Sequence, residues 1–108
     1  MRIQVAARHC EIPDSVRTRT EEQITRLAKY HPRIAAAEAI YEEVKRVRSV
    51  EVILSIDGSE PVVARGEGEE FRSALDKVID RLSRILRRQR SQVTEHKGPR
   101  GAEGILSE

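Results

Sequence analysis

Four basic residues recur at spacings of four, three and four between positions 77 and 88. At ~100° per residue, this spacing brings the four side chains to within ~60° of one another around an α-helix, in steps of roughly 5–6 Å. A row of ammonium and guanidinium groups with this geometry is suited to binding the phosphates of a nucleic acid. We call this row the basic ladder, and its members are Lys77, Arg81, Arg84 and Arg88.

The same charges have a simpler interpretation as the solvated face of a helix. Basic residues near a helix C-terminus stabilise its dipole, as do acidic residues such as Glu69 and Glu70 near the N-terminus. The dipole effect fades within the last turn, so it does not account for Lys77 or Arg81. Residues 77–90 contain six basic residues and one acidic residue, whereas helices that need only solubility usually mix charges. On this helix alone, both interpretations stay open.

The stretch that positions the ladder, Glu70–Arg90, predicts an amphipathic helix. Its apolar residues follow the i, i+3, i+4, i+7 spacing of one buried stripe, beside which the ladder runs. Asp76 and Asp80 lie on the flank away from the ladder. The apolar stripe consists of Phe71, Ala74, Leu75, Val78, Leu82, Ile85 and Leu86.

Two further elements precede this helix in the first third of the chain. Residues 2–8 alternate between apolar and polar side chains, which predicts a strand. Pro13 and Asp14 mark a helix start, and His31-Pro32 marks its end, so we expect a helix from about Asp14 to Tyr30. Its buried stripe is expected to be Val16, Thr20, Ile24, Leu27 and Ala28.

The middle of the chain mixes one ambiguous stretch with two clearer ones. Helix propensity alone favours a helix for Ala35–Arg46, since its alternation as a strand is weak. Val50–Ile56 alternates and is rich in β-branched residues, which predicts a strand. Asp57-Gly58-Ser59 is a hairpin turn signal, and Pro61–Gly66 follows as a short strand.

Length and composition indicate one domain. The chain has 108 residues and a net charge of +2, so its positive charge is concentrated locally rather than being large overall. We expect residues 1–90 to form the domain and residues 91–108 to form a flexible C-terminal tail, because no apolar period continues there. A single cysteine, Cys10, excludes an internal disulfide and fits a reducing compartment. No apolar run indicates a membrane span and no leader pattern indicates secretion, so we expect a cytoplasmic protein. We also expect the protein to be monomeric when free.

The residue types offer little for catalysis. The histidines and the cysteine lack metal-ligand spacing, and no acid, base and nucleophile can be singled out as a set. The aromatic residues are too few for a base-stacking platform, so any nucleic acid is expected to be contacted through its phosphates. We therefore expect neither an enzyme nor a cofactor, metal or small-molecule substrate.

Taken in order, several motifs resemble a known family. The early ones are Arg8-His9, Glu11-Ile12 and Leu27-Ala28-Lys29-Tyr30. They are similar to the start of the ribosome hibernation-promoting factors, also called the ribosome-associated inhibitor or sigma-modulation family. The later ones are Val50-Glu51-Val52, Glu70-Phe71, Ala74-Leu75-Asp76, Val78-Ile79-Asp80-Arg81-Leu82 and Ile85-Leu86-Arg87-Arg88.

The resemblance covers roughly residues 1 to 90 and implies an α+β fold. The family's element order is β-α-β-β-β-α, with a four-stranded mixed sheet and two helices packed on one face. This order replaces the helix expected for Ala35–Arg46 with the second strand. A right-handed crossover then makes the first two strands parallel.

The resemblance also implies a function. Members of the family bind the small ribosomal subunit where mRNA and tRNA would sit, which inhibits translation and stabilises idle ribosomes during stress. Side-by-side packing of the two helices is expected to merge their basic residues into one rRNA-binding patch. Carried over by position, together with Arg8 at the end of the first strand, the expected rRNA-binding residues are Arg8, Arg17, Arg26, Lys29, Lys77, Arg81, Arg84, Arg87 and Arg88.

An alternative function stays open. The older family name suggests a protein-binding regulator, for example a modulator of a sigma factor, that uses the exposed sheet face or the tail. Long family members carry a second domain that joins two ribosomes, and this chain stops before one could form. Whether the protein promotes or prevents ribosome pairing is therefore left undecided by the sequence.

Overall fold

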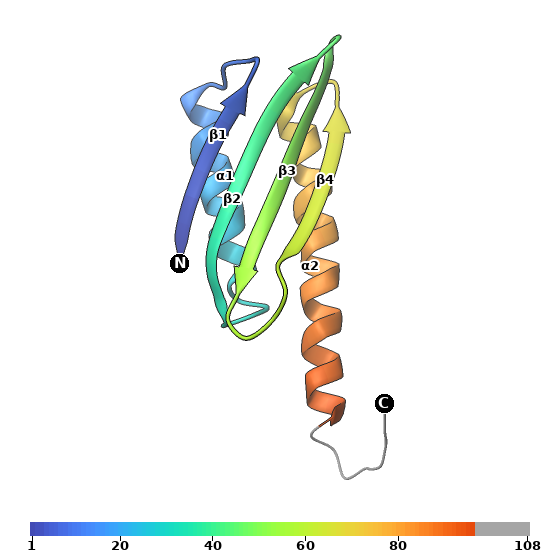
Figure 1. Ribbon diagram of the computed structural model, residues 1–108. Helices are drawn as coiled ribbons and strands as arrows, with labels where there is room; N and C mark the ends of the chain where they lie inside the picture. The colour runs from blue at the N-terminus through green and yellow to red at the C-terminus, as the bar shows by residue number, and fades with distance from the viewer. Residues whose placement is uncertain (97–108) are drawn as a thin grey trace.

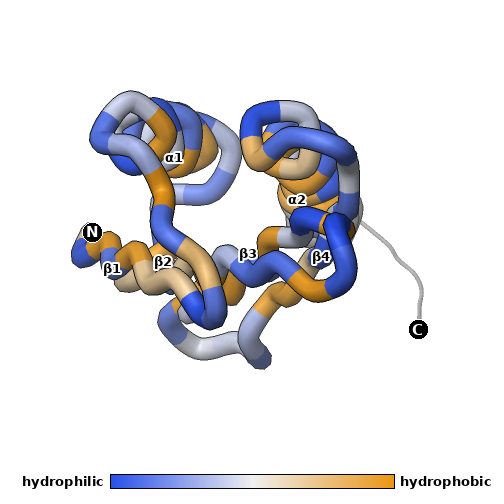
Figure 2. Tube along the Cα trace, turned by 90° about the horizontal axis from the view of Figure 1, so that it is seen from above, coloured by the Kyte–Doolittle hydropathy of each residue, from blue (hydrophilic) through white to orange (hydrophobic). Residues whose placement is uncertain are grey.

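The computed structural model describes residues 1–96, which form four strands and two helices in the order β-α-β-β-β-α (Figure 1). Both helices lie on the same face of the sheet, as the view from above shows (Figure 2). The expected α+β class and element order are thus confirmed. Neither of these two helices is long and apolar enough to cross a membrane. The elements are β1 (Arg2–Arg8), α1 (Asp14–Leu27), β2 (Ile34–Val44), β3 (Val47–Ile56), β4 (Val62–Gly68) and α2 (Phe71–His96).

The strands follow one another across the sheet in the order β1-β2-β3-β4. β1 and β2 are parallel and are connected through α1, whereas β2, β3 and β4 form an antiparallel meander. β2 is an interior strand with partners on both sides. The helix that propensity favours at Ala35–Arg46 is therefore wrong, and the strand implied by the resemblance is correct. Backbone pairing with two neighbours outweighs the helix preference of the alanines and glutamates.

Several predicted boundaries also differ from the structure. α1 ends at Leu27 rather than Tyr30, because the next three amides bond to carbonyls three residues back in a tighter turn. β3 begins at Val47 rather than Val50, and β4 spans Val62–Gly68 rather than Pro61–Gly66. α2 continues through His96, so residues 91–96 belong to the helix rather than to the predicted tail. The rest of that predicted tail, residues 97–108, lies outside the described residues.

The hydrophobic core lies between the sheet and the two helices. Alternate residues of β3 (Val50, Val52, Leu54 and Ile56) are buried, as the sequence pattern predicts. The apolar stripe of α2 packs onto the same core, with Ile85 only partly buried at its edge. In the predicted stripe of α1, Val16, Thr20, Ile24 and Leu27 are buried, whereas Ala28 is half-buried in the turn that follows. This packing fixes which flanks of the helices face the solvent.

Tyr41 is the largest fully buried side chain and connects three elements. Its hydroxyl shares a hydrogen bond with the Thr20 hydroxyl of α1, which in turn donates to the Val16 carbonyl. Its ring meets the Phe71 ring edge-on, with 5.3 Å between centroids and 86° between planes. Burial raises the pKa of the Tyr41 hydroxyl above its ordinary value, because the phenolate would lose its hydration.

The protein is expected to lose stability as the pH rises through about 10, where a tyrosine in the unfolded chain is half ionised. Folded Tyr41 resists ionisation, so its contribution is complete below the unfolded pKa and is lost as the pH rises through the higher folded pKa. Tyr41→Phe removes this pH-dependent contribution to stability, so the free energy of unfolding of the variant should decline less steeply between pH 9 and 11. Urea unfolding at several pH values, compared with the unmodified protein, measures the difference. Parallel pH profiles for the two proteins would contradict it.

Candidate nucleic-acid interface

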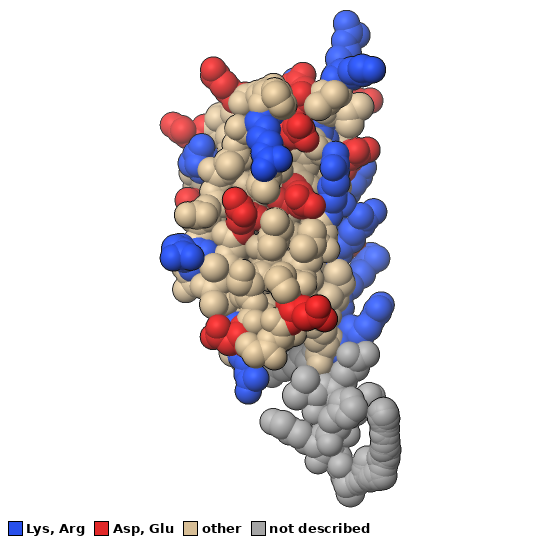
Figure 3. Space-filling model, viewed as in Figure 1, with Lys and Arg blue, Asp and Glu red and all other residues tan. Residues whose placement is uncertain are grey.

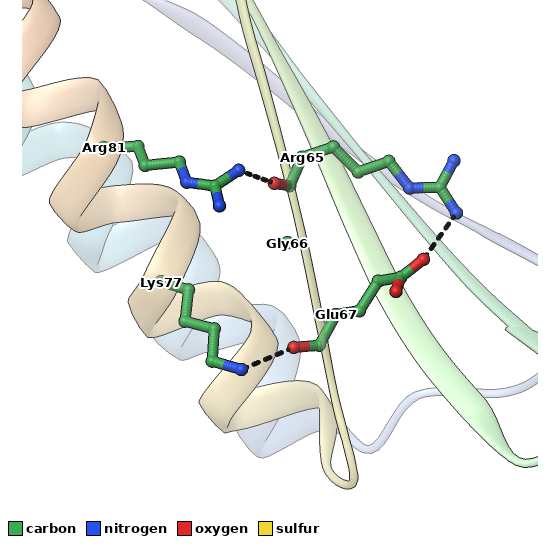
Figure 4. Close-up of a pocket in the computed structure, with 5 residues that line it drawn as sticks. All are labelled: Arg65, Gly66, Glu67, Lys77 and Arg81. Carbon is green, nitrogen blue, oxygen red and sulfur yellow. Dashed lines mark hydrogen bonds and ion pairs between the residues drawn. The ribbon is translucent and has the colours of Figure 1, made fainter.

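The first two ladder residues lie beside the edge of the sheet. Lys77 Nζ donates to the Glu67 carbonyl of β4 at 2.8 Å, and Arg81 Nη1 donates to the Arg65 carbonyl at 2.7 Å (Figure 4). Between them, Gly66 lets the helix approach closely, because a Cβ there would lie 2.8 Å from the Ala74 carbonyl oxygen. Four side chains and the backbone of Gly66 line an open groove of about 450 Å³, formed by Arg65, Gly66, Glu67, Lys77 and Arg81.

These two bonds satisfy carbonyls that no strand covers. β4 is the last strand of the sheet, so its outer edge offers unpaired backbone groups to solvent or to another chain. Lys77 and Arg81 supply donors to that edge from α2. An ammonium carries three N–H donors and a guanidinium five, so both groups keep donors for an anion in solution. The two side chains therefore have a structural contact and remain available for phosphate.

The other two ladder residues extend beyond the groove. Arg84 pairs with Asp80 one turn earlier, with Nη2 and Oδ2 2.8 Å apart, and both side chains are largely exposed. The predicted position of Asp80 on the flank away from the ladder is therefore wrong. An exposed i, i+4 pair contributes only a few tenths of a kcal/mol, about 0.3–0.5 by measurement on helices, so a phosphate can compete with Asp80. Arg88 is exposed and has no ion pair within the described residues. Neither of these two side chains bonds to the strand edge, so both are available to a ligand.

Arg87 and Arg26 lie on other flanks of their helices than the ladder does. The Arg87 guanidinium carbon stands 5.1 Å from the centroid of the Tyr30 ring, a cation–π distance. On the same side, Arg19 of α1 pairs with Asp76 of α2 at 3.1 Å. Arg26 follows Arg19 by seven residues, or ~20° short of two full turns, so it shares that flank. Arg87 thus lies against Tyr30 and Arg26 is exposed on the Arg19 flank of α1, so neither residue belongs to the ladder.

Arg17 and Arg8 lie away from the ladder, and a single rRNA-binding patch that joins the two helices stays a prediction. Arg17 Nη1 donates to the Val5 carbonyl at 3.1 Å, so it lies at the β1 edge, on the opposite side of the molecule from β4. Arg8 alternates with the inward-facing Val5, which puts it on the face of the sheet away from the helices. Lys29 is exposed in the turn after α1. Secondary structure alone could not reveal which flank of each helix meets a strand edge.

The distribution of charge on the surface follows from this arrangement. In Figure 3, Lys and Arg side chains form a column along the edge where α2 lies in Figure 1, while the face in front is mostly uncharged with scattered acidic groups. No group of three His, Cys, Asp or Glu side chains in the described part of the chain could hold a metal ion. The arrangement is suited to binding an anionic polymer along one edge.

Two features of this surface were not predicted from the sequence. Gly66 was expected only as the end of a short strand, although Val62, Ala64 and Gly66 occupy successive inward positions of β4 and decrease in size. That decrease is a signal of a helix packed close to the strand. Lys45 and Arg46 were absorbed into the helix expected for Ala35–Arg46, and they form the turn between β2 and β3.

Comparison with protein families gives a match over most of the chain. The family model described as sigma 54 modulation protein / S30EA ribosomal protein matches residues 3–94. A similar relative is a ribosome hibernation promoting factor of Azotobacter vinelandii, 29% identical over 104 residues, which cover 95% of this chain and 96% of the relative.

Two solved structures have a similar fold. A ribosomal subunit interface protein from Coxiella burnetii has a TM-score of 0.78 at 21% identity, covering 84% of this chain and 99% of that one. The N-terminal domain of protein Y from Thermus thermophilus has a TM-score of 0.74 at 24% identity, covering 82% and 99% respectively. At these identities the two structures establish the fold.

Proposed function

The chain belongs to the sigma 54 modulation protein / S30EA ribosomal protein family, and we propose on that basis that it binds the small ribosomal subunit at the mRNA/tRNA channel. The family and the relatives named for ribosome hibernation identify a ribosome-associated binding protein rather than an enzyme. In this proposal the protein occupies the channel through its basic ladder, inhibits translation and stabilises idle ribosomes. In this proposal the protein acts on ribosomes in the cytoplasm.

The observation that carries the proposal is the ladder along the solvent side of α2. From Lys77 to Arg88 the helix advances by roughly 16 Å, and the four basic groups follow that line. Tyr41 and Phe71 are buried and Tyr30 is covered by Arg87, so the described aromatic side chains offer no stacking platform for bases. Recognition of RNA by this edge would therefore depend on phosphates and backbone shape.

Binding to purified small ribosomal subunits is expected to weaken steeply with salt. Each phosphate contact should add about 0.7–0.9 to the slope of log affinity against log salt concentration, because bound cations are released. Four ladder contacts predict a slope of about 3 or more. Co-sedimentation with subunits between 50 and 300 mM salt measures it, and large subunits serve as the control. A protein that sediments equally with both subunits, or without salt dependence, would contradict the proposal.

A protein partner on the open face of the sheet is the second candidate. Ile40 and Ile53 are half-buried there and Val63 is 49% exposed, next to acidic residues such as Glu38 and Glu51. An apolar surface with acidic neighbours suits a protein better than RNA. Binding of this kind would survive reversal of the ladder charges, which distinguishes the two functions.

A further inference from the structure

The turn between β2 and β3 combines backbone strain with exposed charge. It has two residues, Lys45 and Arg46, and both have positive φ angles, 51° and 68°. Two-residue hairpin turns of this kind favour Asn-Gly, since residues with longer side chains adopt positive φ at a conformational cost. Lysine and arginine at these positions give the turn two cations, but they adopt its backbone conformation less readily than Asn-Gly would.

The side chains around this turn are unusually accessible. Val44 is 50% exposed and Val47 is 45% exposed, and both cations are exposed. Neither Lys45 nor Arg46 forms an ion pair within the part of the chain that the structure describes. The nearby Glu43 is already paired with Arg48, with 3.4 Å between charged atoms. The turn thus presents two uncompensated cations between two exposed apolar side chains.

The turn also lies at the same end of the molecule as the start of the ladder. Lys77 bonds to the Glu67 carbonyl, and Glu67 is the sheet partner of Ser49. From Ser49 the strand needs two more residues, roughly 7 Å, to reach Val47 at the turn. In Figure 3, basic side chains extend from this end, and a column of basic side chains follows the α2 edge below them, with acidic side chains in between.

We propose that the β2–β3 turn, Val44–Val47, is a second RNA contact of this protein. Lys45 and Arg46 bind phosphates of the RNA strand that the ladder holds, and the two valines pack against its sugars or unstacked bases. The two valines provide an apolar contact that the buried or covered aromatic residues cannot provide. Such a contact with RNA would account for the exposure of both valines at the end of this hairpin. This inference rests on the proposed function, because it assumes that the ladder binds rRNA.

The double variant K45N/R46G tests the contact. It keeps the turn type and removes both charges, so the thermal midpoint of unfolding should rise while binding to small subunits weakens by about tenfold. The salt slope should fall by about 1.4, the value for two single-stranded phosphate contacts. The matched control R2Q/R33Q removes two exposed charges at the opposite end of the sheet, and it should change affinity less than threefold.

The outcomes separate this inference from the proposed function. If the unmodified protein does not bind small subunits, the proposed function fails. If it binds and K45N/R46G binds as tightly as R2Q/R33Q, the turn contact is overturned. A photoreactive residue in the variant Val47→p-benzoylphenylalanine should crosslink to rRNA in the bound complex. Crosslinks to ribosomal protein alone, or no crosslinks, would overturn the assignment to RNA.

Discussion

Replacement of Arg84 and Arg88 by glutamate is expected to lower the affinity for small ribosomal subunits by about 100-fold or more. A hydrogen bond to a charged group contributes about 1.5–3 kcal/mol, and every 1.4 kcal/mol is a factor of ten. Both side chains are exposed and lie off the apolar stripe, so the fold should remain intact. Arg81 is left unchanged because it holds the Arg65 carbonyl of β4. Sedimentation with subunits measures the affinity, and circular dichroism verifies the fold.

Two controls separate local contact from overall charge. Reversal of Arg2 and Arg72 gives the same net charge away from the ladder, and it should cost less than tenfold in affinity. Asp80→Asn frees Arg84 from its ion pair and should raise the affinity a few-fold. Equal losses for the two double reversals would mean that net charge, rather than the ladder, determines binding.

Replacement of Gly66 by alanine is expected to lower the free energy of unfolding by about 1–3 kcal/mol, the usual cost of overpacking. The added Cβ would stand 2.8 Å from the Ala74 carbonyl oxygen and 2.9 Å from Val78 Cγ2. Both atoms belong to α2, so the helix must move away from β4, and the contacts of Lys77 and Arg81 with the strand should lengthen. Urea unfolding measures the stability.

Gly68→Ala is the matched control on the same strand. The nearest atom to its new Cβ would be Ser73 Oγ at 2.7 Å, at the end of a side chain that can rotate away. Its cost should be about 1 kcal/mol or less, the value of the one hydrogen bond from Ser73 that would be disturbed. If Gly66→Ala proved no more destabilising than Gly68→Ala, the close approach of α2 to β4 would not be a constraint.

The sequence by itself determined most of the elements and the inward-facing residues. Periods of two and of 3.6 residues identified β1, α1, β3 and the apolar stripe of α2, because burying one face imposes those periods on any chain. The spacing of Lys77, Arg81, Arg84 and Arg88 likewise determined that they share a helix flank. What such patterns report is local geometry within one element.

The tertiary structure decided what each element lies against. Residues 34–44 are a strand because two neighbouring strands supply their hydrogen bonds. One of these neighbours, β1, is separated from β2 along the chain by the whole of α1. The basic residues separate into the β1 edge, the space between the helices and the β4 edge because of how α1 and α2 are rotated on the sheet. That rotation follows from packing between residues of different elements, such as Gly66 of β4 against Ala74 and Val78 of α2.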